Sequence, residues 1–399
     1  MCSSDLKWNF DEEIAREGTD CIKYDLREKT FGRKDIIPLW VADMDFRTPG
    51  FITDRISERA AHGIFGYSFR PASYFGSITW WLKKRFDWQV DPEWIVFCPG
   101  IVPALNISTL VFTRPGDHVI VQPPVYMPFF PAVEAHGRVL FNNRLAENEG
   151  RWTMDIDSLK KDLPDNTSMI IISNPHNPAG RAWLPEELRA IADICLERKI
   201  LILSDEIHSD LVLPGFRHTP VASLSDEISD ITVTCIAPSK TFNLAGLSTS
   251  TVIISNPVLR KYFARKTDNL HIGNGNIFGN TASMAAYSQE GAEWVDELML
   301  YINENVSFVS GYFRELIPEI IPVRPEATYL IWLDCRSLSM NGEELERFFV
   351  EKAGVGLSEG SRFGPGGEGF MRMNLGAPRS TLAKAMEKIE KAIKELRPA

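Results

Sequence analysis

Short apolar runs rich in β-branched residues recur through the middle of the chain. They are apolar throughout instead of alternating with polar positions, which is typical of strands in a sheet covered on both faces. We predict strands at residues 94–98, 118–122, 169–173, 200–204, 231–236 and 250–255.

Helical patterns lie between these runs. From residue 184 to residue 198, apolar side chains recur at the spacing of one helix face, and Pro185 suits the first turn of such a helix. Because strands and helices alternate along the chain, we predict an α/β fold with a mostly parallel sheet.

The C-terminal part of the chain has a different pattern. Residues 329–335 are predicted to form a strand, and Ser380 is predicted to cap a helix whose apolar stripe ends near Leu396. We therefore expect a large α/β domain over residues 49–290. Residues 291–399, joined by residues 1–48, are expected to form a smaller α/β domain.

The composition narrows the class of protein without identifying a reaction. Of the 399 residues 24% are charged, and the net charge of −10 argues against a general binder of nucleic acid or of an anionic membrane. No two of the six cysteines lie within four residues of each other, so we expect no zinc or redox motif and no metal. The polar N-terminus lacks the apolar core of a signal peptide, and no apolar stretch approaches the length of a membrane span. We expect a soluble cytoplasmic protein.

Three polar residues follow consecutive predicted strands in the middle of the chain. Asn177, Asp205 and Lys240 come after the strands predicted at 169–173, 200–204 and 231–236. Each has a structural alternative, since Asn-Pro pairs form turns, an aspartate after a strand often caps a helix, and a lysine in a loop is usually solvated. Ligands of parallel sheets gather at the carboxyl ends of strands, so the three together indicate a binding site.

The chemistry of an aldehyde cofactor explains this combination of residue types. The amine that forms an imine with such a cofactor must be a lysine. A carboxylate beside a pyridine nitrogen keeps that nitrogen protonated, so the ring can absorb carbanion charge. A side-chain amide can donate to the phenolate oxygen of the ring. Lys240, Asp205 and Asn177 fit these roles, which predicts a pyridoxal 5'-phosphate site anchored on Lys240.

Several motifs carry a resemblance to a known family. They are PLWVADMDF (38–46), FGYS (65–68), DEIH (205–208), SKTFNLAG (239–246) and RMNLGAPR (372–379). With them the chain resembles the fold-type-I pyridoxal-phosphate enzymes of the aminotransferase class I/II superfamily. More narrowly, it is similar to the MalY/PatB group of cystathionine β-lyases and cysteine C–S lyases. The resemblance implies their fold, a large domain with a mostly parallel sheet and a smaller C-terminal α/β domain.

The resemblance also implies which residues hold the cofactor. The turn Gly100-Ile101-Val102 opens a helix and matches the cradle of the cofactor phosphate, to which Ser239 adds a hydroxyl. Tyr126 matches the aromatic residue that stacks on the pyridine ring and is counted with Lys240 as catalytic. Its structural alternative is a tyrosine of the core.

Three further positions have implied roles with open alternatives. Tyr67 matches a tyrosine that reaches the phosphate from the neighbouring subunit of a homodimer, or it packs locally. His208, three residues after Asp205, contacts the ring oxygen or only packs. Arg372 matches the arginine that binds the substrate α-carboxylate, for which its planar bidentate donor is suited, or it forms a surface ion pair.

The implied reaction is α,β-elimination on a small sulfur amino acid. Lys240 acts as general base at Cα, and L-cystathionine, L-cysteine or a related S-substituted cysteine yields a thiol, pyruvate and ammonia. The alternative is amino-acid aminotransfer, but most relatives that transaminate carry an arginine eight residues after the lysine, where this chain has Ser248. A third hypothesis is a regulatory role through binding another protein, which leaves no recognisable motif.

Overall fold

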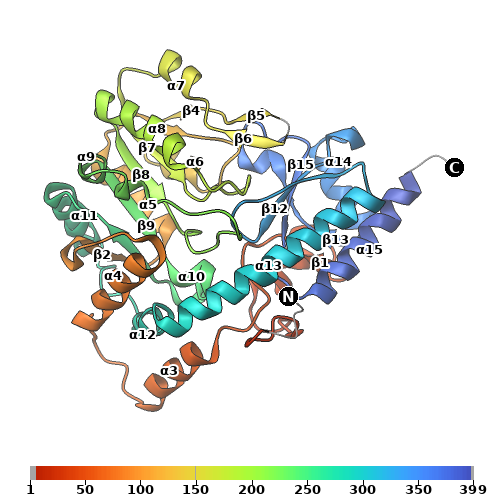
Figure 1. Cartoon of the computed structure of the whole chain (residues 1–399), viewed down its shortest axis with the longest axis horizontal. Coiled ribbons are helices and arrows are strands. Elements are labelled where there is room, and N and C mark those ends of the chain that lie inside the picture. The colour runs from red at the N-terminus through yellow and green to blue at the C-terminus, as the bar shows by residue number, and fades with distance from the viewer. Residues whose placement is uncertain (1–5, 149, 397–399) are drawn as a thin grey trace.

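A seven-stranded sheet forms the centre of the larger part of the molecule in the computed structural model, which describes residues 6–148 and 150–396 (Figure 1). β10 is antiparallel to both of its neighbours, and the other adjacent strands are parallel. This sheet is therefore mostly parallel, as predicted. Its strands in spatial order are β2 (Ile95–Cys98), β10 (Ser250–Ile253), β9 (Thr232–Ile236), β8 (Leu201–Asp205), β7 (Thr167–Ser173), β3 (His118–Val121) and β4 (Val139–Asn142).

Both faces of this sheet are covered, which explains why the strand sequences are apolar throughout. On β7, Met169 and Ile171 pack into the cluster that contains α5 (Ile101–Phe112), α6 (Phe129–Glu134) and α11 (Pro257–Asn269). Ile170 and Ile172 face the opposite cluster with α7 (Ile156–Asp162), α8 (Pro185–Arg198) and α9 (Asp226–Asp230). Successive side chains of a strand point to opposite faces of the sheet, and here both faces meet an apolar layer.

The predicted elements match the structure, with one exception at the start of the last helix. Each of the six predicted runs contains a strand, and α8 covers the predicted helix with Pro185 at its first position. β4 was not predicted, because it lies at the edge of the sheet and both of its end residues, Val139 and Asn142, are exposed. The prediction that Ser380 caps the last helix is wrong, since α15 (Arg379–Leu396) already includes it and its hydroxyl donates to Glu13 Oε1 at 2.5 Å.

A second, antiparallel sheet lies in the C-terminal part of the chain. Its strands are β11 (Ile321–Val323), β12 (Leu330–Asp334), β15 (Phe370–Asn374) and β14 (Ser358–Glu359). The long helix α13 (Gln289–Leu316) runs from α12 (Ile277–Ala286) at one end to this sheet and α15 at the other (Figure 1). Apolar side chains of α13, α15 and part of this sheet belong to one core cluster, whereas Trp332 and Phe370 belong to the cluster that contains α7 and α8.

The N-terminal segment packs against the C-terminal part and not against its neighbours in sequence. β1 (Ile37–Pro38) pairs in parallel with β13 (Val355–Gly356), and the backbone of Leu39 bonds to both Gly356 and Asn374. This contact agrees with the expected joining of residues 1–48 to 291–399, although the domain limits themselves stay a prediction.

The other helices and strands are α1 (Ile22–Asp25), α2 (Arg27–Phe31), α3 (Gly50–Ala61), α4 (Ala72–Phe86), α10 (Pro238–Thr241), α14 (Gly342–Arg347), β5 (Ala146–Asn148) and β6 (Arg151–Thr153).

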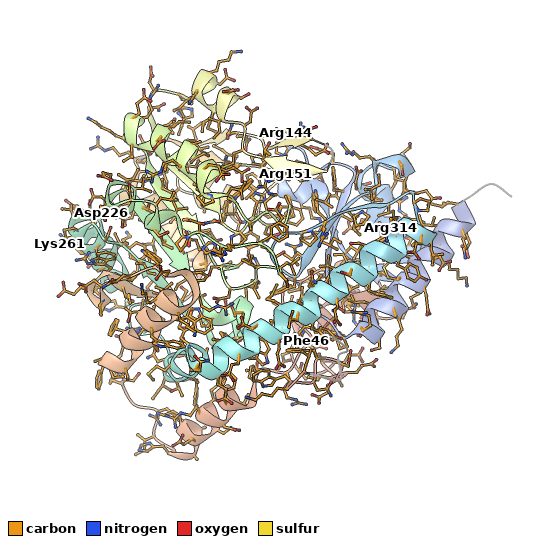
Figure 2. All side chains as sticks on the ribbon, viewed as in Figure 1. Phe46, Arg144, Arg151, Asp226, Lys261 and Arg314 are labelled. Atoms are coloured by element: carbon orange, nitrogen blue, oxygen red, sulfur yellow. The ribbon has the colours of Figure 1, made fainter. Side chains whose placement is uncertain are left out.

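Charged side chains cover the outside of the molecule. Arg144, Arg151, Asp226 and Lys261 are exposed on the larger part, whereas Phe46 is buried beneath α13 (Figure 2). Across residues 6–148 and 150–396, none of the helices is both long and apolar enough to span a bilayer.

Candidate active site

A cavity of about 180 Å³ lies where the carboxyl ends of the central strands meet the start of α5. β7 and β8 end beside it, and α10 follows the end of β9. Parallel strands deliver their following residues to one edge of the sheet, which is why segments distant in sequence meet here. Nine predicted site residues line this cavity: Gly100, Ile101, Val102, Tyr126, Asn177, Asp205, His208, Ser239 and Lys240.

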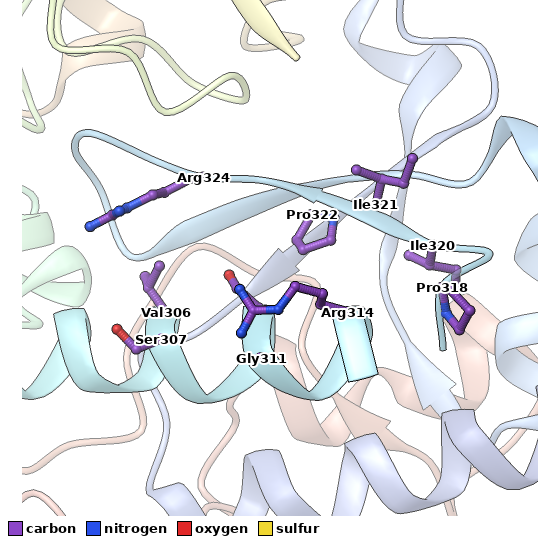
Figure 3. Close-up of a pocket in the computed structure, with 10 residues that line it drawn as sticks. Val306, Ser307, Gly311, Arg314, Pro318, Ile320, Ile321, Pro322 and Arg324 are labelled. Atoms are coloured by element: carbon purple, nitrogen blue, oxygen red, sulfur yellow. The ribbon is translucent and has the colours of Figure 1, made fainter. Parts of the chain in front are cut away.

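A larger cavity of about 530 Å³ lies elsewhere, between α13 and β11 (Figure 3). Its polar lining consists of Ser307, Ser310, Arg314 and Arg324, and the rest is mainly proline and aliphatic residues. It offers no lysine, histidine, carboxylate or thiol among its described lining residues, so it lacks a group for imine formation or proton transfer. The smaller cavity, which brings Lys240, Asp205 and Asn177 together, is the candidate active site.

Lys240 lies in the short helix α10 and not in a loop. Pro238 takes the first position of that helix, and the Lys240 Nζ atom donates to the Ala42 carbonyl oxygen at 2.6 Å. Burial, reinforced by the positive charge of Arg372, lowers the pKa of Lys240 to about 8. The alternative of a solvated lysine is wrong, and an amine with this pKa is more often in the neutral, nucleophilic form at neutral pH than an ordinary lysine.

Asp205 is the last residue of β8 and faces the same cavity. Its Oδ1 atom accepts a hydrogen bond from the Ile207 amide at 3.2 Å, and no helix follows it for a capping role. Burial raises the pKa of Asp205 to about 7, against the opposing effect of Lys240. A cation placed against this buried carboxylate would stabilise its ionised form, so a protonated pyridine nitrogen fits here.

Asn177 and Arg372 are hydrogen-bonded to each other at the wall of the cavity. Arg372 Nη1 donates to Asn177 Oδ1 at 3.1 Å, which leaves the Asn177 amino group as a donor. Arg372 Nη2 donates to the Trp40 carbonyl oxygen at 2.9 Å, and the side chain lies 3.4 Å from Ser358 Oγ.

Arg372 retains an unused donor in this arrangement. It is buried, so the alternative of a surface ion pair is wrong, and burial lowers its pKa to about 10. Its Nε atom is buried without a hydrogen-bond partner among the described residues. A buried guanidinium with a free N–H is suited to bind a small carboxylate.

His208 and Tyr126 line the cavity with aromatic rings. Burial lowers the pKa of His208 to about 3, so its ring is neutral, and its Nδ1 atom has no partner among the described residues. Tyr126 is half-buried and packs edge-on against Phe129, with 6.1 Å between ring centroids. It lies at the boundary of the apolar core and the cavity, so the position combines core packing with a surface on which a planar ring can stack.

The start of α5 and the segment after Lys240 form the other end of the cavity. Gly100 precedes this 12-residue helix, whose first amide groups are free of helical partners and suit an anion such as phosphate. Ser239, Ser248 and Thr249 line the same cavity with hydroxyl-bearing side chains. Ser248, which stands eight residues after Lys240 in place of the arginine of most transaminating relatives, therefore lies beside the site.

Two predicted site residues do not line the cavity: Arg372, which is hydrogen-bonded to the lining residue Asn177, and Tyr67. Tyr67 is fully exposed on the segment between α3 and α4, together with Ile64, Phe65 and Phe69. The alternative of a locally packed tyrosine is wrong. Among the described residues, Tyr67 is not one that lines the cavity of its own chain.

Among the residues that were not predicted, Ala42 and Tyr329 are connected to Lys240 by hydrogen bonds. Ala42 lines the cavity, and its carbonyl oxygen accepts hydrogen bonds from Lys240 and from the Tyr329 hydroxyl. The motif at 38–46 was visible in the sequence, but a backbone acceptor carries no residue-type signal. Tyr329 begins a predicted strand, and no role in the site was predicted for it.

Comparisons with known proteins were made for the whole chain. The model of the family "Aminotransferase class I and II" matches residues 68–389. The chain is 44% identical to cystathionine beta-lyase PatB of Bacillus subtilis over 96% of its length and all of that protein. It is 29% identical to protein MalY of Escherichia coli over 98% of its length and all of that protein. The crystal structure of cystalysin from Treponema denticola, which contains pyridoxal 5'-phosphate, superposes with a TM-score of 0.95 at 36% identity, covering 98% of this chain and all of that one.

Proposed function

The chain belongs to the family of class I and II aminotransferases, and on this basis we propose that it is a pyridoxal-phosphate-dependent carbon–sulfur β-lyase. The observation that carries the proposal is the meeting of Lys240, Asp205 and Asn177 around one cavity, with Arg372 hydrogen-bonded to Asn177. The near-full-length similarity to a cystathionine β-lyase selects the reaction within the family.

The residues around the cavity fit the cofactor from end to end. The buried Asp205 carboxylate suits a protonated pyridine nitrogen, and the Asn177 amino group suits the phenolate oxygen. The start of α5 and Ser239 suit the phosphate, with Tyr126 against the ring. When bound, pyridoxal phosphate supplies an electron sink that stabilises negative charge at the substrate Cα atom.

The chain supplies positioning and proton transfer. Arg372 holds the substrate carboxylate through the donors that its contacts with Trp40 and Asn177 leave free. Lys240 Nζ removes the Cα proton as general base, for which its lowered pKa makes the neutral fraction near neutral pH greater than that of an ordinary lysine.

The net reaction is α,β-elimination followed by hydrolysis. The Cα–H and Cβ–S bonds break, the sulfur leaves as a thiol, and the released aminoacrylate takes up water to give pyruvate and ammonia. With L-cystathionine the thiol is homocysteine, and with L-cysteine it is hydrogen sulfide. Ser248, where transaminating relatives carry an arginine, lies beside the cavity and favours this reaction over aminotransfer.

The deciding experiment is turnover of L-cystathionine without any keto acid. We expect stoichiometric thiol and pyruvate from the wild type and none from Lys240→Ala. Aminotransfer predicts the opposite dependence, since it needs a keto acid and releases no thiol. Absence of both thiol and pyruvate from pure, cofactor-loaded wild type would contradict the lyase proposal.

We also propose a homodimer in which Tyr67 reaches the neighbouring cavity. Its support is the set of exposed apolar side chains around Tyr67, which a second copy can cover. The acidic charge and the absence of a predicted disulfide motif support a cytoplasmic location. A regulatory role through another protein stays a separate hypothesis, tested by asking whether Lys240→Ala retains a cellular effect.

A further inference from the structure

The Ala42 carbonyl oxygen is shared by two donors in the candidate site. Lys240 Nζ donates to it at 2.6 Å, and the Tyr329 hydroxyl donates to it at 2.9 Å. A carbonyl oxygen has two lone pairs, so it can accept both bonds at once. Tyr329 is fully buried, and its ring packs edge-on against His208 with 6.2 Å between centroids. The position of the Lys240 amine is therefore tied to the position of this one carbonyl.

Side-chain amides fix the backbone on both sides of Ala42. Asn374 Nδ2 donates to the Val41 oxygen at 2.7 Å and to the Asp43 oxygen at 2.6 Å. Asn243 Nδ2, three residues after Lys240 in the chain, donates to the Met44 oxygen at 2.9 Å. The segment that carries Ala42 is thus bonded both to β15 and to the segment that follows Lys240.

An ion-pair cluster holds the same segment from its other side. Arg16 pairs with Asp43 at 2.7 Å and with Asp45 at 2.6 Å, and Lys23 pairs with Asp45 at 2.8 Å. Lys23 is completely buried and Asp45 is 5% exposed. Burying such charges is costly and is often no more stabilising than apolar packing, so stability alone is a weak reason for this cluster.

We propose that Tyr329 and Arg16 are positioning residues for Lys240, because they hold the Ala42 carbonyl as the acceptor for its amine. This inference rests on the proposed function in one respect, that Lys240 is the reacting amine. As the proposed general base at Cα, the Lys240 amine needs a defined place within reach of that atom. A displacement of about 1 Å in a reacting group can lower a rate about 100-fold, so a fixed acceptor has a large effect on the chemical step.

The test compares two tyrosine-to-phenylalanine variants of the holoenzyme. Tyr329→Phe keeps the buried ring and removes only the hydroxyl. Tyr301→Phe is the matched control, because Tyr301 is also buried and its hydroxyl bonds to Asp11 and to the Arg379 amide, away from Ala42. We expect Tyr329→Phe to lower kcat for thiol release at least about 10-fold with KM within about threefold, and Tyr301→Phe to leave both near wild type.

A second readout is independent of turnover. Apoprotein is mixed with pyridoxal phosphate, the rate of covalent attachment is followed by absorbance, and borohydride reduction with peptide mass analysis locates the modified lysine. We expect attachment at Lys240 to slow at least about 10-fold in Tyr329→Phe and in Arg16→Gln, with partial recovery in Arg16→Lys. Arg47→Gln is the control for the arginine, because Arg47 pairs with Glu12 at the surface and does not reach Asp43.

The outcomes separate the two proposals. If the wild type attaches the cofactor on Lys240 but releases no thiol, the proposed function fails, and the attachment rates still test the positioning role. Wild-type kcat and attachment rate in Tyr329→Phe overturn the positioning role. Equal losses in Tyr329→Phe and Tyr301→Phe, in step with a lower melting temperature, also overturn it, because they show general destabilisation.

Discussion

At the scale of single residues, the main feature of the site is that Asp205 and Lys240 have similar pKa values. Burial raises the pKa of Asp205 to about 7 and lowers that of Lys240 to about 8. The pKa values of an ordinary aspartate and an ordinary lysine differ by about six units or more. Both shifts disfavour the charged form, so the burial of these two groups lowers the stability of the folded apoprotein. A cationic ring against Asp205 would offset part of this loss.

The first prediction concerns the stability of the apoprotein with Asp205→Asn. Because the folded-state pKa of Asp205 is above its usual 3.8, its contribution to stability is greatest below about pH 4 and is lost as the pH rises through about 7. The asparagine side chain of the variant does not ionise and has no such loss. We expect the variant apoprotein to exceed the wild-type apoprotein in free energy of unfolding by about 2–4 kcal/mol at about pH 8, with the difference shrinking toward about pH 5.

The measurement is urea unfolding of both apoproteins at several pH values. The same variant should bind pyridoxal phosphate more weakly and lose most lyase activity, because it cannot keep the ring nitrogen protonated. A variant that is less stable than wild type above neutral pH, or a difference that does not depend on pH, would contradict the burial of an ionisable carboxyl here.

At the scale of elements, strand β15 fixes the position of Arg372, the proposed contact of the substrate carboxylate. Arg372 lies opposite Trp332 on β12 and opposite Ser358 on β14, so strand register directs its side chain toward Asn177. The site thus combines the central sheet with the antiparallel sheet. A change in the register of β15 by one residue would turn Arg372 to the other face.

The second prediction is that Arg372→Lys weakens substrate binding more than it slows chemistry. Lysine keeps the positive charge but lacks the planar set of donors that binds Asn177 and the Trp40 carbonyl and leaves an N–H for the substrate carboxylate. We expect KM for L-cystathionine to rise about 10- to 100-fold, equivalent to about 1.4–2.7 kcal/mol, with a smaller change in kcat. Steady-state kinetics on the cofactor-saturated enzyme measure both.

Arg379→Lys is the matched control for that variant. Arg379 lies in the same sequence motif, but its Nε atom donates to Asn305 at 2.8 Å and its side chain covers Phe308. We expect its KM to stay within about twofold of wild type. If Arg379→Lys raised KM as much as Arg372→Lys, the effect would belong to the fold of this region and not to a carboxylate contact.

The sequence predicted elements well where burial is complete and less well at edges and short turns. β7 and β8 were recognisable because every position meets an apolar layer. β4 was not, because an edge strand with exposed ends has no such signal. Among site residues, Lys240, Asp205 and Asn177 were recognisable from residue type and order. Ala42 was not, because its role depends on a carbonyl that only the packing of Tyr329 and Asn374 brings to Lys240.

At the scale of the whole molecule, the segment between α3 and α4 is the feature that one chain leaves unexplained. Ile64, Phe65, Tyr67 and Phe69 are exposed there, although large apolar side chains of this kind usually find a partner surface. Sequence alone could suggest that Tyr67 acts in a neighbouring subunit only through family resemblance. Its exposure gives a physical reason, because within its own chain it contributes nothing to the cavity.

The last prediction tests this sharing by subunit complementation. Tyr67→Ala and Lys240→Ala homodimers should each be nearly inactive, the first because each phosphate loses a contact and the second because each base is missing. In a mixed dimer, one site carries both changes and the other carries neither. An equimolar mixture that is unfolded and refolded together should therefore recover about a quarter of wild-type activity, since about half of the dimers are mixed and each has one intact site. Recovery should be absent when the two folded proteins are mixed without exchange of subunits.

The outcome differs if Tyr67 acts within its own chain. Neither site of a mixed dimer would then be intact, because one chain would lack the base and the other the tyrosine. Activity would stay at the level of the two parent variants.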